Sequence, residues 1–188
     1  MASVSRALCF CALLLLCACS TAPPLPSYGV VPDFTLTDQT GNPFHSKDKL
    51  DGHVWIADFI YTNCMGPCPR MSTEMNKIRA EIGDNPNIKS VSFTIDPERD
   101  TPTVLAAYGK RYKAEPDRWY LLTGTRPELK RLNWDTFHLG DVNGDLEHST
   151  RFVLIDAKSS IRGYYDSSDQ ESIRQLVTDI KRLSKDSG

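Results

Sequence analysis

The chain has 188 residues, with 22 basic and 24 acidic side chains and a formal net charge of −2. This length suits one domain with a substantial core and is too short for two comfortable domains. The near-neutral charge and the lack of any basic run exclude the electrostatic signature of a nucleic-acid-binding protein. We therefore expect no nucleic-acid partner.

The first 18 residues, MASVSRALCFCALLLLCA, have the pattern of a secretory signal peptide. A short start with one charge, Arg6, precedes an apolar run that is shorter than the roughly 20 residues of a membrane-spanning helix. The run ends in Leu16-Cys17-Ala18-Cys19, which is similar to the lipobox of bacterial lipoproteins and predicts Cys19 as the lipidated first residue of the mature chain. An uncleaved anchor is the alternative. Both place the domain in the cell envelope, on the periplasmic side, attached to the membrane.

Residues 19–30 contain three prolines and no charge, which predicts an extended Pro-rich tether before a domain at 31–188. Removal of the leader leaves two of the six cysteines in that domain, Cys64 and Cys68. An exported domain with two cysteines this close together has no disulfide framework. The pair therefore predicts local chemistry.

The first half of the domain alternates strands and helices. A hairpin is predicted over 33–44, followed by a central strand over 53–62 that is covered on both faces. A helix is predicted from about Pro67 to Gly83, because proline suits the first helical turn and glycine a helix end. A buried strand over 90–96 and a helix from Thr101-Pro102 to about Lys113 follow.

The second half continues with a strand over 119–123 and a short helix starting at Pro127. Residues 149–156 and 161–166 predict a hairpin, and a closing helix follows with apolar residues on one side from 173 to 183. This order predicts an α/β fold with a mixed sheet flanked by helices. The cysteines follow the central strand, at the sheet edge where open α/β sheets place their sites.

The segment YTNCMGPCPRMS, residues 61–72, places two thiols at a helix start, which stabilises a thiolate. A redox couple, part of a soft metal site, a peroxidatic thiol or two buried packing residues all fit this pattern. A metal site would need a third ligand. Met65 could lie over such a metal, whereas Met71 and Met75 have the spacing of core residues.

The chain has four histidines that could complete a metal site. His45 and His53 come before the central strand, near turn residues, and are predicted to be exposed. His148 immediately precedes the strand 149–156, whose end can approach the Cys64 loop. His138 is its rival, and either could instead be a solvated loop residue. Three charged residues further along are interpreted as turn and cap residues of the next helix: Asp96, Arg99 and Asp100.

The segments YTNCMGPCPRMS, FTIDPERDTPTVLAAYGKRY and EHSTRFVLID together resemble the Sco/SenC family, over about residues 30–185. The resemblance implies a thioredoxin-like fold, copper binding and a part in the assembly of cytochrome c oxidase. It also implies copper ligands at Cys64, Cys68 and His148. Two thiolates and an imidazole suit Cu(I) and can hold Cu(II), whereas zinc usually takes a fourth ligand. The chain departs from many members by having Met65, and not proline, after the first cysteine.

Three functions follow as hypotheses. The first is a metallochaperone that delivers copper to the copper-receiving subunit of cytochrome c oxidase, for its dinuclear centre. The second is a thiol–disulfide reductase in which Cys64 and Cys68 form a redox-active disulfide, served by a thioredoxin-like reductant outside the cytoplasm. The third is a thiol peroxidase, for which the residues before Cys64 match poorly. Enzymatic activity is left open by the sequence.

Overall fold

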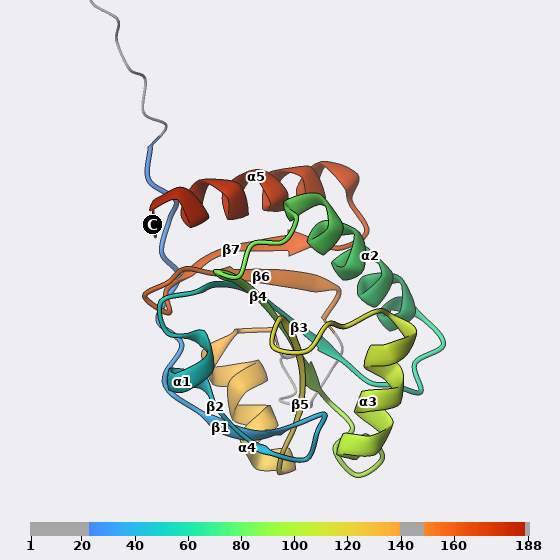
Figure 1. Cartoon of the computed structure of the whole chain (residues 1–188). Helices are drawn as coiled ribbons and strands as arrows, with labels where there is room; N and C mark the ends of the chain where they lie inside the picture. Colours follow the sequence, from blue (N-terminus) through green and yellow to red (C-terminus); the bar gives the residue numbers. More distant parts are fainter. Residues whose placement is uncertain (1–22, 140–148, 187–188) are drawn as a thin grey trace, which may run out of the picture.

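The computed structural model describes residues 23–139 and 149–186, which form a seven-stranded mixed sheet with helices on both faces (Figure 1). The strand order is β2-β1-β5-β4-β3-β6-β7. In chain order the strands are β1 (Thr35–Asp38), β2 (Pro43–His45), β3 (Val54–Ile60), β4 (Ile88–Thr94), β5 (Trp119–Thr123), β6 (Arg151–Ile155) and β7 (Ile161–Asp166). The predicted α/β fold with a mixed sheet is confirmed.

Strands β3, β4 and β5 run parallel at the centre, and the strands around them are antiparallel. All seven residues of β3 are buried, as the apolar run predicts for a strand covered on both faces. Because side chains alternate along a strand, Ile56 and Ile60 face one hydrophobic cluster while Trp55 and Phe59 face the other. The central strand therefore joins the two halves of the core.

The first face of the sheet is covered by α2 (Pro67–Ile82), α3 (Pro102–Arg111) and α5 (Gln170–Asp186). The other face is covered by α1 (Ser46–Leu50), α4 (Arg126–Arg131) and the π-helical turn η1 (Leu132–Thr136). An aromatic cluster fills this second face, where the Phe59 and Phe93 rings stack with centroids 5.0 Å apart. None of the helices within 23–139 and 149–186 is long and apolar enough to cross a membrane.

Helix ends follow local chemistry. Gly66 precedes α2, whose first residue is Pro67, and Gly83 ends the helix with a positive φ of 73° that suits glycine. Helix α4 begins at Arg126, one residue before the predicted start, because Thr125 and Glu128 form a capping box. The short elements α1 and η1 were not predicted, since neither has enough residues to show an apolar period.

The face of β4 that lies beneath α2 carries three hydroxyl residues, each bound to one charged side chain. Arg79 donates to Ser90 at 3.2 Å, Ser92 donates to the Asp58 carboxylate at 2.6 Å, and Thr94 donates to Asp100 at 2.6 Å. These charged partners are buried, and the hydroxyls give each of them a hydrogen bond that burial requires. A row of buried polar residues on β4, with their charged partners, therefore runs through the core toward the carboxyl end of β3.

Residues 23–31, most of them in the predicted Pro-rich tether, lie against β7 and α5. The N–H of Tyr28 donates to the carbonyl of Ile161 at 2.9 Å, and the N–H of Ile161 donates to the carbonyl of Gly29 at 2.9 Å. The guanidinium of Arg162 donates to the carbonyl of Leu25, and that of Arg182 to the carbonyl of Pro23. This segment is extended and is bound to the domain.

We predict that this bound segment contributes to stability. A variant lacking residues 1–30 should unfold at lower urea than one lacking residues 1–22, because it loses the backbone bonds to Ile161 and the bonds that Arg162 and Arg182 donate to residues 23–25. The expected difference is about 2–4 kcal/mol, from net hydrogen-bond contributions near 1 kcal/mol each. Urea denaturation of the two variants measures it. Equal midpoints would mean that residues 23–30 add nothing to the fold.

Candidate dithiol site

The two cysteines lie at the junction of β3 and α2, at the carboxyl end of the central strand. Cys64 is in the loop and Cys68 is the second residue of α2. Both are free thiols and both are buried, Cys68 completely. Between them Met65 is 99% exposed, so the loop presents a thioether to solvent while it covers the sulfurs.

The Cys64 sulfur collects hydrogen bonds. Burial alone opposes its ionisation, but bonds from the N–H and the thiol of Cys68 outweigh it, and the pKa of Cys64 is lowered from its ordinary value. The N–H of Gly66, at 3.4 Å, and the hydroxyl of Tyr61 act in the same direction. Donors aimed at one sulfur favour its charged form. Cys64 is therefore the more acidic thiol of the pair.

Cys68 has the opposite character. Burial is the main cause that raises the pKa of its thiol to about 12, and the bond that the thiol donates to the Cys64 sulfur adds to the rise. The N–H of Tyr61 opposes both effects. The dithiol thus pairs one sulfur ready to react with a second sulfur that keeps its proton, which is the asymmetry that thiol–disulfide exchange uses.

The loop that carries Cys64 is held by the buried carboxylate of Asp100. This carboxylate accepts from the N–H of Thr62 at 3.1 Å, from the Thr62 hydroxyl at 2.5 Å and from the Thr94 hydroxyl at 2.6 Å. Asp100 is 1% exposed, so these bonds form away from water, where charged acceptors are strong. The end of β4 thereby fixes the residues just before the reactive thiol.

The interpretation of Asp96, Arg99 and Asp100 as turn and cap residues holds only in part. The carbonyl of Asp96 accepts from the N–H groups of Arg99 and Asp100, which is a turn, and Thr101 caps α3. The side chain of Asp100 caps no helix and instead points to the cysteine loop. A signal was available, because Thr62 and Thr94 lie at or near the ends of the two predicted central strands, where an aspartate of the following segment can bind both.

A second buried carboxyl, Asp58, is the one charged residue of β3. It lies on the same face of β3 as Ile56 and Ile60, which belong to the cluster that contains the cysteines. Ser92 donates to one of its oxygens, and the other has no partner among the described residues. Burial raises its pKa from 3.8 to about 7, against the effect of the Ser92 bond, and its charge contributes to the raised pKa of Cys68.

Among the histidines, His148 and the whole of 140–148 lie outside the described residues, as does Cys19. The described residues alone contain no cluster of three potential metal ligands. Strand β6 pairs antiparallel with β3, Ala57 opposite Val153, so β6 begins at the edge where β3 ends. His138 is exposed and follows Phe137, which packs on the opposite face from the cysteines.

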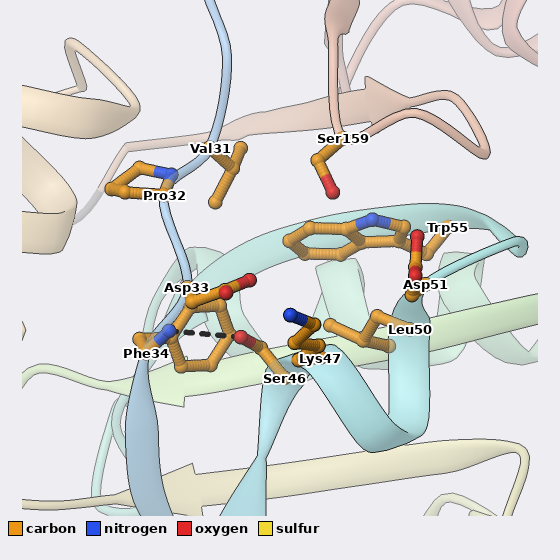
Figure 2. A pocket seen from close by; sticks show the side chains of 10 residues that line it. All are labelled: Val31, Pro32, Asp33, Phe34, Ser46, Lys47, Leu50, Asp51, Trp55 and Ser159. Carbon is orange, nitrogen blue, oxygen red and sulfur yellow. Dashed lines mark hydrogen bonds between the residues drawn. The ribbon is translucent and has the colours of Figure 1, made fainter.

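A hollow of about 220 Å³ lies at the other end of β3 (Figure 2). The Trp55 indole forms one wall, and residues of α1 and the segment before β1 form the others. The indole N–H has no partner among the described residues. Since Trp55 is the second residue of β3 and faces away from the cysteine cluster, this hollow is separate from the dithiol.

The fold and the paired thiols define a protein of the thioredoxin-like class. Residues 23–185 match the SCO1/SenC family, and the chain belongs to that family. A solved SCO1/SenC family lipoprotein from Bacillus anthracis str. Ames is 34% identical, with a TM-score of 0.74, covering 82% of this chain and 95% of that one. The expected resemblance and the thioredoxin-like fold are confirmed.

Two further solved relatives bear on chemistry. BsSco, described as having a disulfide switch and as a member of the Sco family of cytochrome c oxidase assembly proteins, is 27% identical with a TM-score of 0.73. The match covers 87% of this chain and 98% of that one. Yeast Sco1 with copper bound is 25% identical with a TM-score of 0.62, covering 85% of this chain and 95% of that one.

We predict that Asp58 makes stability fall as pH rises. A carboxyl with a raised pKa in the folded state holds its proton more tightly there than in the unfolded chain, so stability declines from about pH 4 and levels off above about pH 7. The stability advantage of Asp58→Asn over the parent should therefore grow by roughly 2–3 kcal/mol between pH 5 and pH 8. Urea denaturation at the two pH values measures this. A constant difference would contradict a buried, titrating Asp58.

Proposed function

We propose that this protein binds copper through Cys64, Cys68 and His148 and acts as a metallochaperone for the dinuclear copper centre of cytochrome c oxidase. The observation that carries the proposal is the pair of adjacent free thiols at the carboxyl end of β3, one with a lowered pKa. A metal binds sulfur only in its deprotonated form, so the lowered pKa of Cys64 reduces the cost of binding. Copper in the yeast Sco1 structure and the assembly role of BsSco support the same conclusion.

The donor set agrees with copper. Two sulfurs from a short loop, with an imidazole as third ligand, make a soft site of low coordination number that suits Cu(I) and can also hold Cu(II). Strand β6 begins at the edge of the sheet where β3 leads into the cysteine loop. His148 stands three positions before Arg151, the first residue of β6, and this supports it as the third ligand.

A second candidate is a thiol–disulfide reductase, and the asymmetry of the two thiols favours it. The Cys64 thiolate would attack a substrate disulfide, and Cys68 would then lose its proton and release the product by closing the Cys64–Cys68 bond. Such chemistry needs both cysteines and no histidine. Copper-site cysteines of the oxidase are a substrate of this kind, and an extracytoplasmic thioredoxin-like protein would return the dithiol to its reduced form.

The location proposed for the protein is the cell envelope. Residues 1–18 would direct export, and lipidated Cys19 would attach the domain to the membrane on the periplasmic side. The Bacillus anthracis relative is a lipoprotein, which supports this attachment. A donor anchored in this way would meet a copper-receiving oxidase subunit in the same membrane by diffusion in two dimensions.

Ligand variants test the copper site. Cys68→Ala and His148→Ala should each lose the single tightly bound copper that the parent takes up, because either change leaves two donors. His138→Ala is the matched control and should bind like the parent. Metal analysis after dialysis against a copper chelator gives the stoichiometry. Retention of copper by Cys68→Ala would remove the site assignment, and retained disulfide reduction in copper-free His148→Ala would support the reductase role.

The redox state of the cysteines should control copper binding. Sulfur in a disulfide offers no thiolate, so the oxidised domain should stay folded and take up no Cu(I), and dithiol reduction should restore uptake. Closing this short loop adds little stability, on the order of 2 kcal/mol or less, so mild reductants should suffice. Cu(I) titration of both forms against a chromophoric chelator provides the measurement. Equal uptake would show that the cysteines are not the gate.

A further inference from the structure

Both thiols of the dithiol are shielded from solvent. Cys68 is completely buried, and Cys64 is 7% exposed. Gly66 lies close to the Cys64 sulfur, because its N–H donates to that sulfur at 3.4 Å and a Cβ atom placed on it would stand 3.9 Å away. A metal ion in solvent therefore meets the outer surface of the loop before it meets either thiol.

The side chain of Met65 forms the most open part of that outer surface. It is 99% exposed, whereas the two other methionines that the structure describes, Met71 and Met75, are completely buried in the core. Since Cys64 and Cys68 are buried as well, Met65 carries the one exposed sulfur among residues 23–139 and 149–186. The described surface thus offers a soft donor at a single point, which lies in the short loop between the two thiols.

A thioether has the chemistry of a transient Cu(I) ligand. Its sulfur is soft and prefers Cu(I) to hard cations. It carries no proton, so it can take up the ion at once, whereas a thiol must lose its proton before it binds. A single neutral sulfur also holds the ion less firmly than two thiolates do. Copper bound at Met65 would therefore move on to the cysteines.

We propose that Met65 is the entry and exit ligand for Cu(I), whose thioether binds the ion on the outside of the loop and passes it to Cys64. This inference deepens the proposed function and rests on Cys64 and Cys68 being copper ligands. The transfer is a ligand exchange in which copper stays Cu(I) and no electron moves. A bond from copper to the Cys64 sulfur forms, the bond to Met65 breaks, and each thiol that binds releases its proton to solvent. The reverse sequence presents the ion to a recipient.

The test is the rate of copper exchange in Met65→Leu, which removes the sulfur and keeps an apolar side chain of similar size. Protein loaded with Cu(I) is mixed without oxygen with an excess of a chromophoric chelator, and equilibrium competition with the same chelator gives the affinity. The exchange rate should fall about tenfold, which corresponds to about 1.4 kcal/mol added to the barrier, while the affinity changes less than about twofold. Met75→Leu is the matched control, because it removes a buried sulfur of α2, and it should exchange like the parent.

Three results would overturn the inference. The first is an exchange rate in Met65→Leu within about twofold of the parent, and the second is equal slowing in Met75→Leu. The third is an affinity that falls in step with the rate, because Met65 would then be a resident ligand of the bound ion and not a point of passage.

A second measurement separates this inference from the proposed function. Ag(I), a soft ion that stands in for Cu(I), is added to protein with carbon-13 in its methionine methyl groups. Once the dithiol is filled, further Ag(I) should shift the Met65 methyl signal and leave those of the buried Met71 and Met75 in place. Copper binding by the parent with an unmoved Met65 signal would remove the role of Met65 alone. Failure of the parent to bind copper would remove the proposed function and the transfer to Cys64 with it.

Discussion

The bond between the Asp100 carboxylate and Thr62 is the constraint on which the site depends. The cysteine loop has few backbone bonds of its own, and Gly66 and the exposed Met65 do little to order it. Asp100 joins the loop to the end of β4 by accepting two hydrogen bonds from Thr62 and one from Thr94, away from water. This attachment positions the residues just before Cys64, and so helps to place its sulfur relative to the N–H groups that stabilise it.

Buried hydrogen bonds to charged side chains continue inward along β4. Three hydroxyl residues on one face of β4 each form a hydrogen bond with a charged side chain. These bonds accommodate Arg79, Asp58 and Asp100 inside a largely apolar core. Two of them are satisfied by several bonds, and Asp58 is left with one bare oxygen. A buried carboxyl with a bare oxygen costs stability, and such sites are found where chemistry is performed. Asp58, the charged residue with the fewest hydrogen bonds of the three, is also the one that raises the pKa of Cys68 electrostatically.

Much of this arrangement could be predicted from the sequence. The apolar run of β3, the proline and glycine at the ends of α2 and the position of both cysteines depend on local patterns, and the structure confirms them. The roles of Asp100 and Asp58 depend on contacts between segments far apart in the chain, which periodicity does not report. Asp100 looked like a cap because caps and buried acceptors use the same residue types. For His148, the resemblance to a family remains the source of its assignment.

Because residues 23–31 are bound along β7, only the residues before Pro23 can act as a tether between the domain and a lipid on Cys19. If Cys19 carries lipid, only three residues separate it from Pro23, which is fastened to Arg182, so this corner of the domain stays within about 14 Å of the bilayer surface. The same end of α5 pairs with Glu81 near the end of α2, and Cys68 lies about 20 Å away at the other end of that helix. Such a short tether would hold this corner of the domain close to the membrane and limit how far the thiols could reach, so that meeting a partner in the same membrane would depend on lateral diffusion.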